Sequence, residues 1–175
     1  MLEKQGVEAL KLRALARRTG VSHNAPYRHF SGSEALLAAL AVEGFEWLTA
    51  AQRTAAAAGG LRAMGEAYVE FALAHPQRFR LMFGGRIPLA KHAHLREVAE
   101  RAFEELSGAL AARFPGAPRA MDCSVAAWAL VHGLAQLLLG AWISGAAKRG
   151  RDDAKFVREV LSATRFVAIP VQSAA

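Results

Sequence analysis

The chain has 175 residues, of which 53% are hydrophobic, so it can bury a sizeable core and is not a disordered tail. Its single cysteine, Cys123, excludes an intramolecular disulfide framework and a CxxC zinc site, and the scarcity of isoleucine and threonine beside abundant alanine predicts an all-α protein. The formal net charge is +7, and residues 11–30 hold five basic residues and no acidic one, which indicates contact with a polyanion or, alternatively, a solvated helix face.

Three helices are predicted near the N-terminus. Residues 12–19 form a short amphipathic helix that Gly20 ends. Ser22 is a candidate N-cap for a second short helix running through His29, and residues 31–34 (SGSE) form a capping box that opens a third. We expect that third helix to continue until the glycine pair at 59–60 breaks it.

Helical periodicity continues through the rest of the chain. A helix over residues 61–75 ends before Pro76, because a residue that precedes proline disfavours the α conformation. The remaining predicted helices are a short one through Met82 and Phe83 that ends at Gly84-Gly85, one over 95–110 that stops at FPGAP (114–118), an apolar one around Trp128, and a final one over 153–167 that Asp152 caps and Pro170 ends.

The segment Val125–Ile143 is apolar along most of its length and is long enough to span a membrane. His132 and Gln136 lie at its centre, however, and polar groups there are costly in lipid. We therefore expect a helix that is buried on all sides in a globular assembly and no membrane partner, with a membrane-associated helical protein as an alternative. Residues 1–6 (MLEKQG) lack the apolar region of a signal peptide, which favours a cytoplasmic protein.

Residues 12–37, LRALARRTGVSHNAPYRHFSGSEALL, resemble the helix-turn-helix of the tetracycline-repressor (TetR) family of bacterial transcriptional regulators. The similarity lies in the first helix and turn, in the YRHF run at 27–30, and in the EALL start of the next helix at 34–37. Each motif alone would be weak, but together they are specific. The resemblance implies a regulator whose partner is double-stranded DNA.

The second short helix would present its N-terminal side chains to the major groove. His23 and Asn24 are candidates for contacts with base edges, because Asn can pair with adenine. Contacts with phosphate groups position a protein on DNA without reading its sequence, and we expect them from Lys11, Tyr27, Arg28 and His29. The full set of candidate DNA-binding residues is Lys11, Ser22, His23, Asn24, Tyr27, Arg28, His29 and Ser33. Phe30 is expected to pack in the core.

The chain departs from the family's usual pattern. Members usually carry Lys at the position of Ser33 and Ser or Thr at that of Lys11, which implies that one phosphate contact is lost and another replaced. The family also has a full first helix, whereas only residues 1–5 precede Gly6 here, so a truncated first helix and a looser DNA-binding unit are expected. The predicted domains are 1–45, the helix-turn-helix, and 46–175, a helical domain for ligand binding and dimerisation.

A second resemblance covers the C-terminal region. FALAHPQRFRLMFGG (71–85) and Trp128, His132 and Gly133 in WALVHG resemble the ligand-sensing and dimerisation domain of the WHG subgroup of that family. The resemblance implies a helical bundle that forms a homodimer and binds a ligand.

Aromatic side chains in this region are numerous enough to line a cavity, although each would also serve as core. His132 lies one turn after Trp128 and is either a polar group for a ligand or a structural histidine held by hydrogen bonds. The candidate ligand-binding residues are Tyr68, Phe71, Phe79, Met82, Phe83, Phe103, Trp128, His132 and Gln136, which suit a small and largely apolar effector.

The sequence contains no GxSxG, P-loop, GxGxxG or HExxH motif, so we expect no catalytic residue and no cofactor. His92 and His94 lie two residues apart and would diverge on a helix, so no metal site is expected. We predict a homodimeric, ligand-responsive transcriptional repressor that acts on a palindromic operator. The alternative is a helical small-molecule-binding dimer that has lost productive DNA binding through its short N-terminus.

Overall fold

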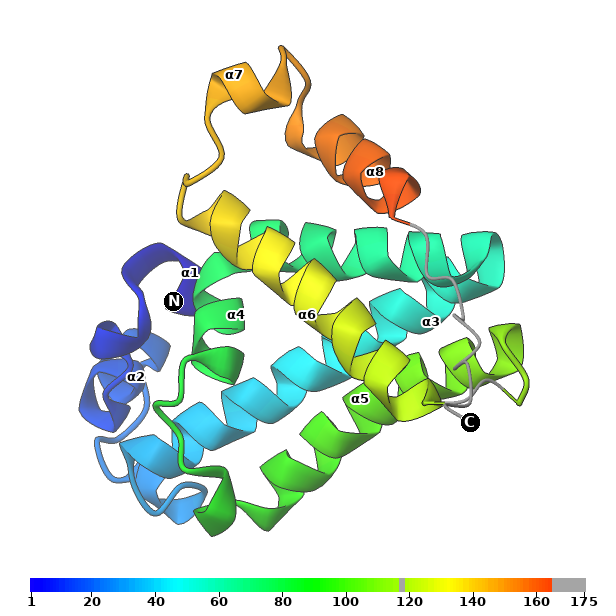
Figure 1. Ribbon diagram of the computed structural model, residues 1–175. Coiled ribbons are helices and arrows are strands. Elements are labelled where there is room, and N and C mark those ends of the chain that lie inside the picture. The colour runs from blue at the N-terminus through cyan, green and yellow to red at the C-terminus, as the bar shows by residue number, and fades with distance from the viewer. Residues whose placement is uncertain (117–118, 165–175) are drawn as a thin grey trace. The chain divides into compact units, whose positions relative to one another are not determined.

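The computed structural model describes residues 1–116 and 119–164 (Figure 1). The described residues form helices and turns and include no strand, which confirms the predicted all-α class. By packing, the chain divides into two compact units. Unit 1 comprises Met1–Trp47 and Ala74–Arg101, and unit 2 comprises Leu48–Leu73 and the described part of 102–164. The segment 74–101 therefore packs with the N-terminal helices, although it lies beyond residue 46.

Unit 1 contains α1 (Leu2–Gln5), η1 (Val7–Ala9), α2 (Leu12–Thr19), η2 (Ala25–Arg28), the start of α3 (Ser33–Ala74), α4 (Pro76–Phe83), η3 (Leu89–Lys91) and the start of α5 (Ala93–Arg113), where η denotes a 3₁₀-helix. The predicted bounds of α2 are confirmed. Gly20 ends this helix in the left-handed conformation, with φ of 70° and ψ of 18°, which glycine adopts without steric cost.

The prediction of a second helix from Ser22 through His29 is wrong in extent and type. The structure has only the 3₁₀-helix η2 there, and Asn24 precedes it. Pro26 accounts for the difference, because it has no N–H group and disfavours the α conformation of Ala25. Ser22 Oγ accepts a hydrogen bond from the backbone N–H of Asn24 at 3.3 Å, so it stabilises the turn before η2.

Helix α3 confirms the predicted break, because Gly60 within it has φ of 69° and ψ of −157° and joins two helices at a kink. The capping box predicted at its start is wrong. The helix begins at Ser33, and the Glu34 carboxylate lies 3.0 Å from His92 Nε2. The capping-box pattern predicts that the Glu34 carboxylate binds the helix terminus, but it contacts His92, which lies 58 residues away in the sequence.

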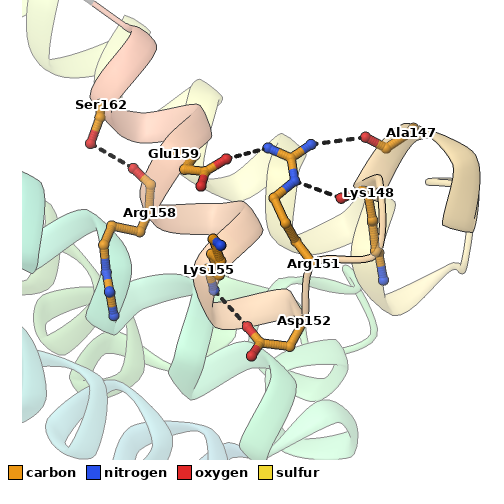
Figure 2. Close-up of polar contacts among 8 residues, drawn as sticks. All are labelled: Ala147, Lys148, Arg151, Asp152, Lys155, Arg158, Glu159 and Ser162. Atoms are coloured by element: carbon orange, nitrogen blue, oxygen red, sulfur yellow. Dashed lines mark hydrogen bonds and ion pairs between the residues drawn. The ribbon is translucent and has the colours of Figure 1, made fainter.

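Unit 2 contains the remainder of α3 and α5 together with α6 (Ala120–Leu139), α7 (Gly145–Lys148) and α8 (Asp153–Ala163). The predicted cap of the last helix is confirmed, since Asp152 Oδ1 accepts a hydrogen bond from the backbone N–H of Lys155 at 2.7 Å (Figure 2). Arg151 donates to the carbonyls of Ala147 and Lys148 and pairs with Glu159, which ties α7 to α8 (Figure 2). The predicted positions 117–118, 167 and 170 lie outside the described residues.

Helix α6 is not buried on all sides by its own chain, and the prediction that a globular assembly buries it stays a prediction. Its large apolar side chains are exposed by 60% at Met121, 49% at Val125, 38% at Trp128 and 47% at Leu137. Among the described residues, α6 is the helix long and apolar enough to cross a membrane, and this is weak evidence, because core helices of soluble proteins pass the same test. An exposed apolar face of this kind more often marks a protein interface.

Candidate nucleic-acid interface and sensor site

The residues predicted to contact DNA form an exposed surface on unit 1. Lys11, Ser22, His23, Asn24, Tyr27, Arg28, His29 and Ser33 are all exposed. Helix α2 and η2 pack against each other, and Leu12, Ala16 and Pro26 are their buried side chains. Tyr27 keeps 47% of its surface exposed, which is unusual for a large ring and suits contact with an external partner. Phe30, predicted to be core, is half-buried.

Four acidic residues of unit 1, Glu3, Glu8, Glu34 and Glu43, contact the segment 77–92. Glu3 accepts hydrogen bonds from the backbone N–H groups of Gln77 and Arg78, and Glu8 pairs with Arg86, whose hydrogen bond lowers the pKa of the Glu8 carboxyl. Glu43 pairs with Arg78 at 2.7 Å, and Glu34 lies beside His92.

The basic residues of the interface are not neutralised in this way. Within the described part of the chain, Lys11, Arg13, Arg17, Arg18 and Arg28 form no ion pair within 4.0 Å. Since the four carboxylates above pair with residues 77–92 and not with these cations, the surface of α2 and η2 keeps its positive charge. A surface of this sign attracts phosphate groups.

Arg78 is the buried charge that holds α4 to α3 within unit 1. It is 8% exposed, and it donates hydrogen bonds to the Leu40 carbonyl at 2.9 Å and to Glu43. Its guanidinium lies 4.1 Å from the centroid of the Trp47 ring. Sequence reasoning missed Arg78 and Glu3, because their partners lie 35 to 75 residues away and no local pattern marks them.

The candidate ligand-binding residues divide between the two units. Phe79, Met82 and Phe83 belong to unit 1, where the rings of Phe79 and Phe83 lie 4.8 Å apart and Phe45 packs edge-on against Phe83 at 5.3 Å. Tyr68, Phe71, Phe103, Trp128, His132 and Gln136 belong to unit 2.

Four of the residues in unit 2 form one polar network. Tyr68 Oη lies 2.8 Å from His132 Nδ1, and the Trp128 Nε1–H group donates to Tyr68 Oη at 3.3 Å. The side-chain nitrogen of Gln136 lies 3.4 Å from His132 Nε2. The ring centroid of Trp128 is 5.8 Å from that of His132 and 5.8 Å from that of Phe103. The network thus combines hydrogen-bonding groups with apolar rings, as small-molecule sites do.

Burial controls the charge of this network. It raises the pKa of the Tyr68 phenol and lowers the pKa of His132, so both side chains are neutral at pH 7. Tyr68 is buried, His132 is half-buried and Gln136 is exposed. The network therefore runs from the interior of unit 2 to its surface.

A separate pocket of about 440 Å³ lies on unit 2 between α3 and α5. Its lining consists of Arg53, Ala56, Met64, Glu104, Glu105, Gly108 and Ala109, none of which was predicted to bind a ligand. Arg53 and Glu105 form an ion pair there, and the hydrogen bond lowers the pKa of the Glu105 carboxyl. Within the described ranges, no group of three or more His, Cys, Asp or Glu side chains could hold a metal ion.

Two family models match the chain. Residues 1–40 match the model described as bacterial regulatory proteins, tetR family, and residues 61–163 match the tetracyclin repressor-like C-terminal domain. No curated protein sequence matches significantly.

Solved structures are similar over nearly the whole chain. A protein of unknown function from Rhodococcus sp. RHA1 is 34% identical, with a TM-score of 0.75, and the match covers 92% of this chain and 86% of the other. The candidate regulatory protein SCO4313 is 26% identical, with a TM-score of 0.73 and coverage of 91% and 86%. The TetR family transcriptional regulator PfmR from Thermus thermophilus is 19% identical, with a TM-score of 0.64 and coverage of 92% and 90%, and this likeness concerns the fold.

Proposed function

The chain belongs to the tetR family of bacterial regulatory proteins, and on that premise we propose that it is a homodimeric, ligand-responsive repressor that binds a palindromic operator. Family membership makes it a DNA-binding transcriptional regulator and points away from an enzyme. The dimer, the ligand and the repressing role are the proposed parts. A repressor of this kind acts in the cytoplasm, where its DNA is found.

The observation that carries the proposal is the exposed basic surface of α2 and η2, whose cations have no ion-pair partners among the described residues. Arg28 is suited to phosphate contact, which contributes similarly for every DNA sequence. Asn24 is suited to a bidentate contact with adenine, which would contribute at one position of each half-site. The two residues therefore make different contributions, which a binding assay can separate.

The test compares the parent protein with Arg28→Ala and Asn24→Ala on a duplex selected from a randomised library and on a random duplex. Arg28→Ala should weaken binding to both duplexes and reduce the slope of log K against log salt by about 1. Asn24→Ala should weaken only the selected duplex, by about 1 to 3 kcal/mol. Arg62→Ala is the matched control, because Arg62 lies in unit 2 and pairs with Glu66.

Equal binding of the parent to both duplexes, together with no effect of Asn24→Ala, would contradict the proposal. That result would favour the second candidate, a helical small-molecule-binding dimer without productive DNA binding.

The exposed apolar face of α6 supports the dimeric part of the proposal. Large apolar side chains that their own chain leaves uncovered gain free energy when a second copy covers them. Helix α8 is amphipathic and buries Phe156 and Val157, so its other face is available to join the same interface. A two-fold dimer would read two half-sites about 34 Å apart.

The network of Tyr68, Trp128, His132 and Gln136 supports the ligand-responsive part. A ligand can release DNA only when it binds the low-affinity arrangement of the dimer more tightly than the DNA-bound one. His132→Ala should therefore weaken the response to an effector while leaving the effector-free DNA affinity nearly unchanged. An unfolded His132→Ala variant, or one with the parent's response, would make His132 a structural residue.

A further inference from the structure

The pocket of about 440 Å³ between α3 and α5 lies wholly within unit 2 and is separate from the polar network described above. Small residues keep it open: Ala56 and Ala109 line it, and a Cβ added at Gly108 would meet no atom within 4 Å. Met64, which is buried, adds a thioether that adapts to the shape of an apolar ligand. The volume lies in the range of small-molecule sites, so the pocket can hold a small and partly apolar molecule.

The charged groups of the pocket are two carboxylates and one guanidinium. Arg53 pairs with Glu105, and their hydrogen bond lowers the pKa of the Glu105 carboxyl, so Glu105 is ionised at pH 7. Glu104 is exposed and lies one helical turn before Gly108 on the same face of α5. Among the described residues, Glu104 forms no ion pair within 4.0 Å. Arg53 therefore offsets one carboxylate and leaves the other uncompensated.

The nearest basic residues of α5 on either side of the pocket have other partners. Arg101 lies 3.6 Å from Glu97, and the Arg113 guanidinium lies 5.1 Å from the centroid of the Phe114 ring. Neither arginine lines the pocket. The pocket therefore keeps a net negative charge, which attracts a cation and repels an anion.

We propose that this pocket binds a primary organic amine in its ammonium form, with the N–H groups on the carboxylates of Glu104 and Glu105 and the apolar chain over Gly108 and Met64. An ammonium group has three donors and a positive charge, and its hydrogen bonds to carboxylates are charge-assisted. An alcohol of the same length brings a donor without the charge, and a carboxylate brings a like charge. The proposal goes beyond the ligand-responsive repressor, because it assigns a ligand class to a pocket outside the proposed sensor network.

The first test uses matched probes of one chain length, octylammonium, 1-octanol and octanoate, on the full chain. Calorimetric titration at low salt should detect binding of octylammonium, weaker binding of 1-octanol and no binding of octanoate. Added salt should weaken the binding of octylammonium, because it screens charges at an exposed site. Binding of octanoate as tight as that of octylammonium would overturn the proposal, and so would the absence of octylammonium binding.

The second test uses variants that locate the bound octylammonium. Glu104→Gln removes the uncompensated charge at nearly constant size and should weaken binding about three- to fivefold, the upper range for an exposed ion pair. Gly108→Leu fills the open space and should abolish binding, and the fold should tolerate it because the added Cβ meets no atom within 4 Å. Arg53→Gln removes the cation that competes for Glu105 and should tighten binding about twofold.

The matched control is Glu70→Gln, because Glu70 is an exposed glutamate of unit 2 that does not line the pocket. The same change of charge there should leave the affinity for octylammonium unchanged. Equal weakening by Glu104→Gln and Glu70→Gln, unchanged affinity in Gly108→Leu, or weaker binding in Arg53→Gln would overturn the proposal.

Circular dichroism verifies that the variants fold, and the comparison of octylammonium with octanoate on the parent decides the question where a variant does not. DNA binding is measured separately, so a failure of the repressor proposal would leave these titrations unaffected.

Discussion

The Glu3 carboxylate accepts a hydrogen bond from the backbone N–H of Arg78 at 2.9 Å, across 75 residues of sequence. Its second oxygen accepts one from the backbone N–H of Gln77 at 3.0 Å. The first N–H groups of a helix have no partner within the helix, and His75, the N-cap residue of α4, makes no side-chain cap. A residue of α1 therefore caps α4, and its negative charge also suits the positive end of the helix dipole.

Removing this cap should destabilise unit 1. We expect Glu3→Ala to lower the free energy of unfolding by about 1 kcal/mol, the usual contribution of a helix cap. Glu3→Gln should lower it by less, because an amide oxygen still accepts one hydrogen bond. Urea denaturation followed by circular dichroism measures both. Glu46→Ala, at an exposed glutamate of the same unit, is the matched control, and an equal loss in that variant would contradict the role of the cap.

Gly44 of α3 packs closely against side chains of α4. A Cβ at this position would lie 2.6 Å from Met82 Sδ and 3.1 Å from Arg78 Cγ and Cδ. Gly44→Ala should therefore destabilise the protein by about 1 to 3 kcal/mol through overpacking. Gly108→Ala, in α5, meets no atom within 4 Å and should stabilise it by up to about 1 kcal/mol, because alanine favours the helix. Thermal denaturation distinguishes the two, and shifts of the same sign would contradict this account.

The stability of the fold should depend on the protonation of His132. Burial lowers its pKa in the folded state below the ordinary value of 6.5, so the unfolded chain binds the proton more readily. Stability should therefore fall as the pH drops through 6.5 toward the folded pKa, and it should be fully present above 6.5. His132→Gln should show a smaller loss between about pH 7.5 and about pH 5.5 in urea denaturation. Identical pH profiles for the two proteins would exclude this contribution.

The exposed face of α6 gives a prediction about assembly. Leu137 is 47% exposed within its own chain, so Leu137→Arg should leave the protomer folded while placing a charge in the proposed interface. We expect monomers in sedimentation velocity, and the same from Leu138→Arg, although Leu138 is half-buried and its replacement also disturbs the protomer. Ala111→Arg, at an exposed position of α5, is the control. An unchanged dimer in both leucine variants would place the interface elsewhere.

The sequence by itself determined the helical class, the family and several helix ends. Gly20 and Gly60 stand at a helix end and a kink with positive φ, Pro76 starts a new helix, and Asp152 caps the last one. Each of these features depends on the conformational preference of one residue or on a hydrogen bond within a single turn. Such effects act over a few residues, so the sequence alone is enough to predict them.

Only the tertiary structure decided the partners of the charged and polar side chains. Glu34 has the local pattern of a cap and pairs with His92, and Glu3 caps α4, a helix that begins only at Pro76. Tyr68 and His132 were both candidates, but their hydrogen bond spans 64 residues. These partnerships arise where packing brings distant segments together, since burial then requires each polar group to find a hydrogen bond, and the nearest group in space is seldom the nearest in sequence.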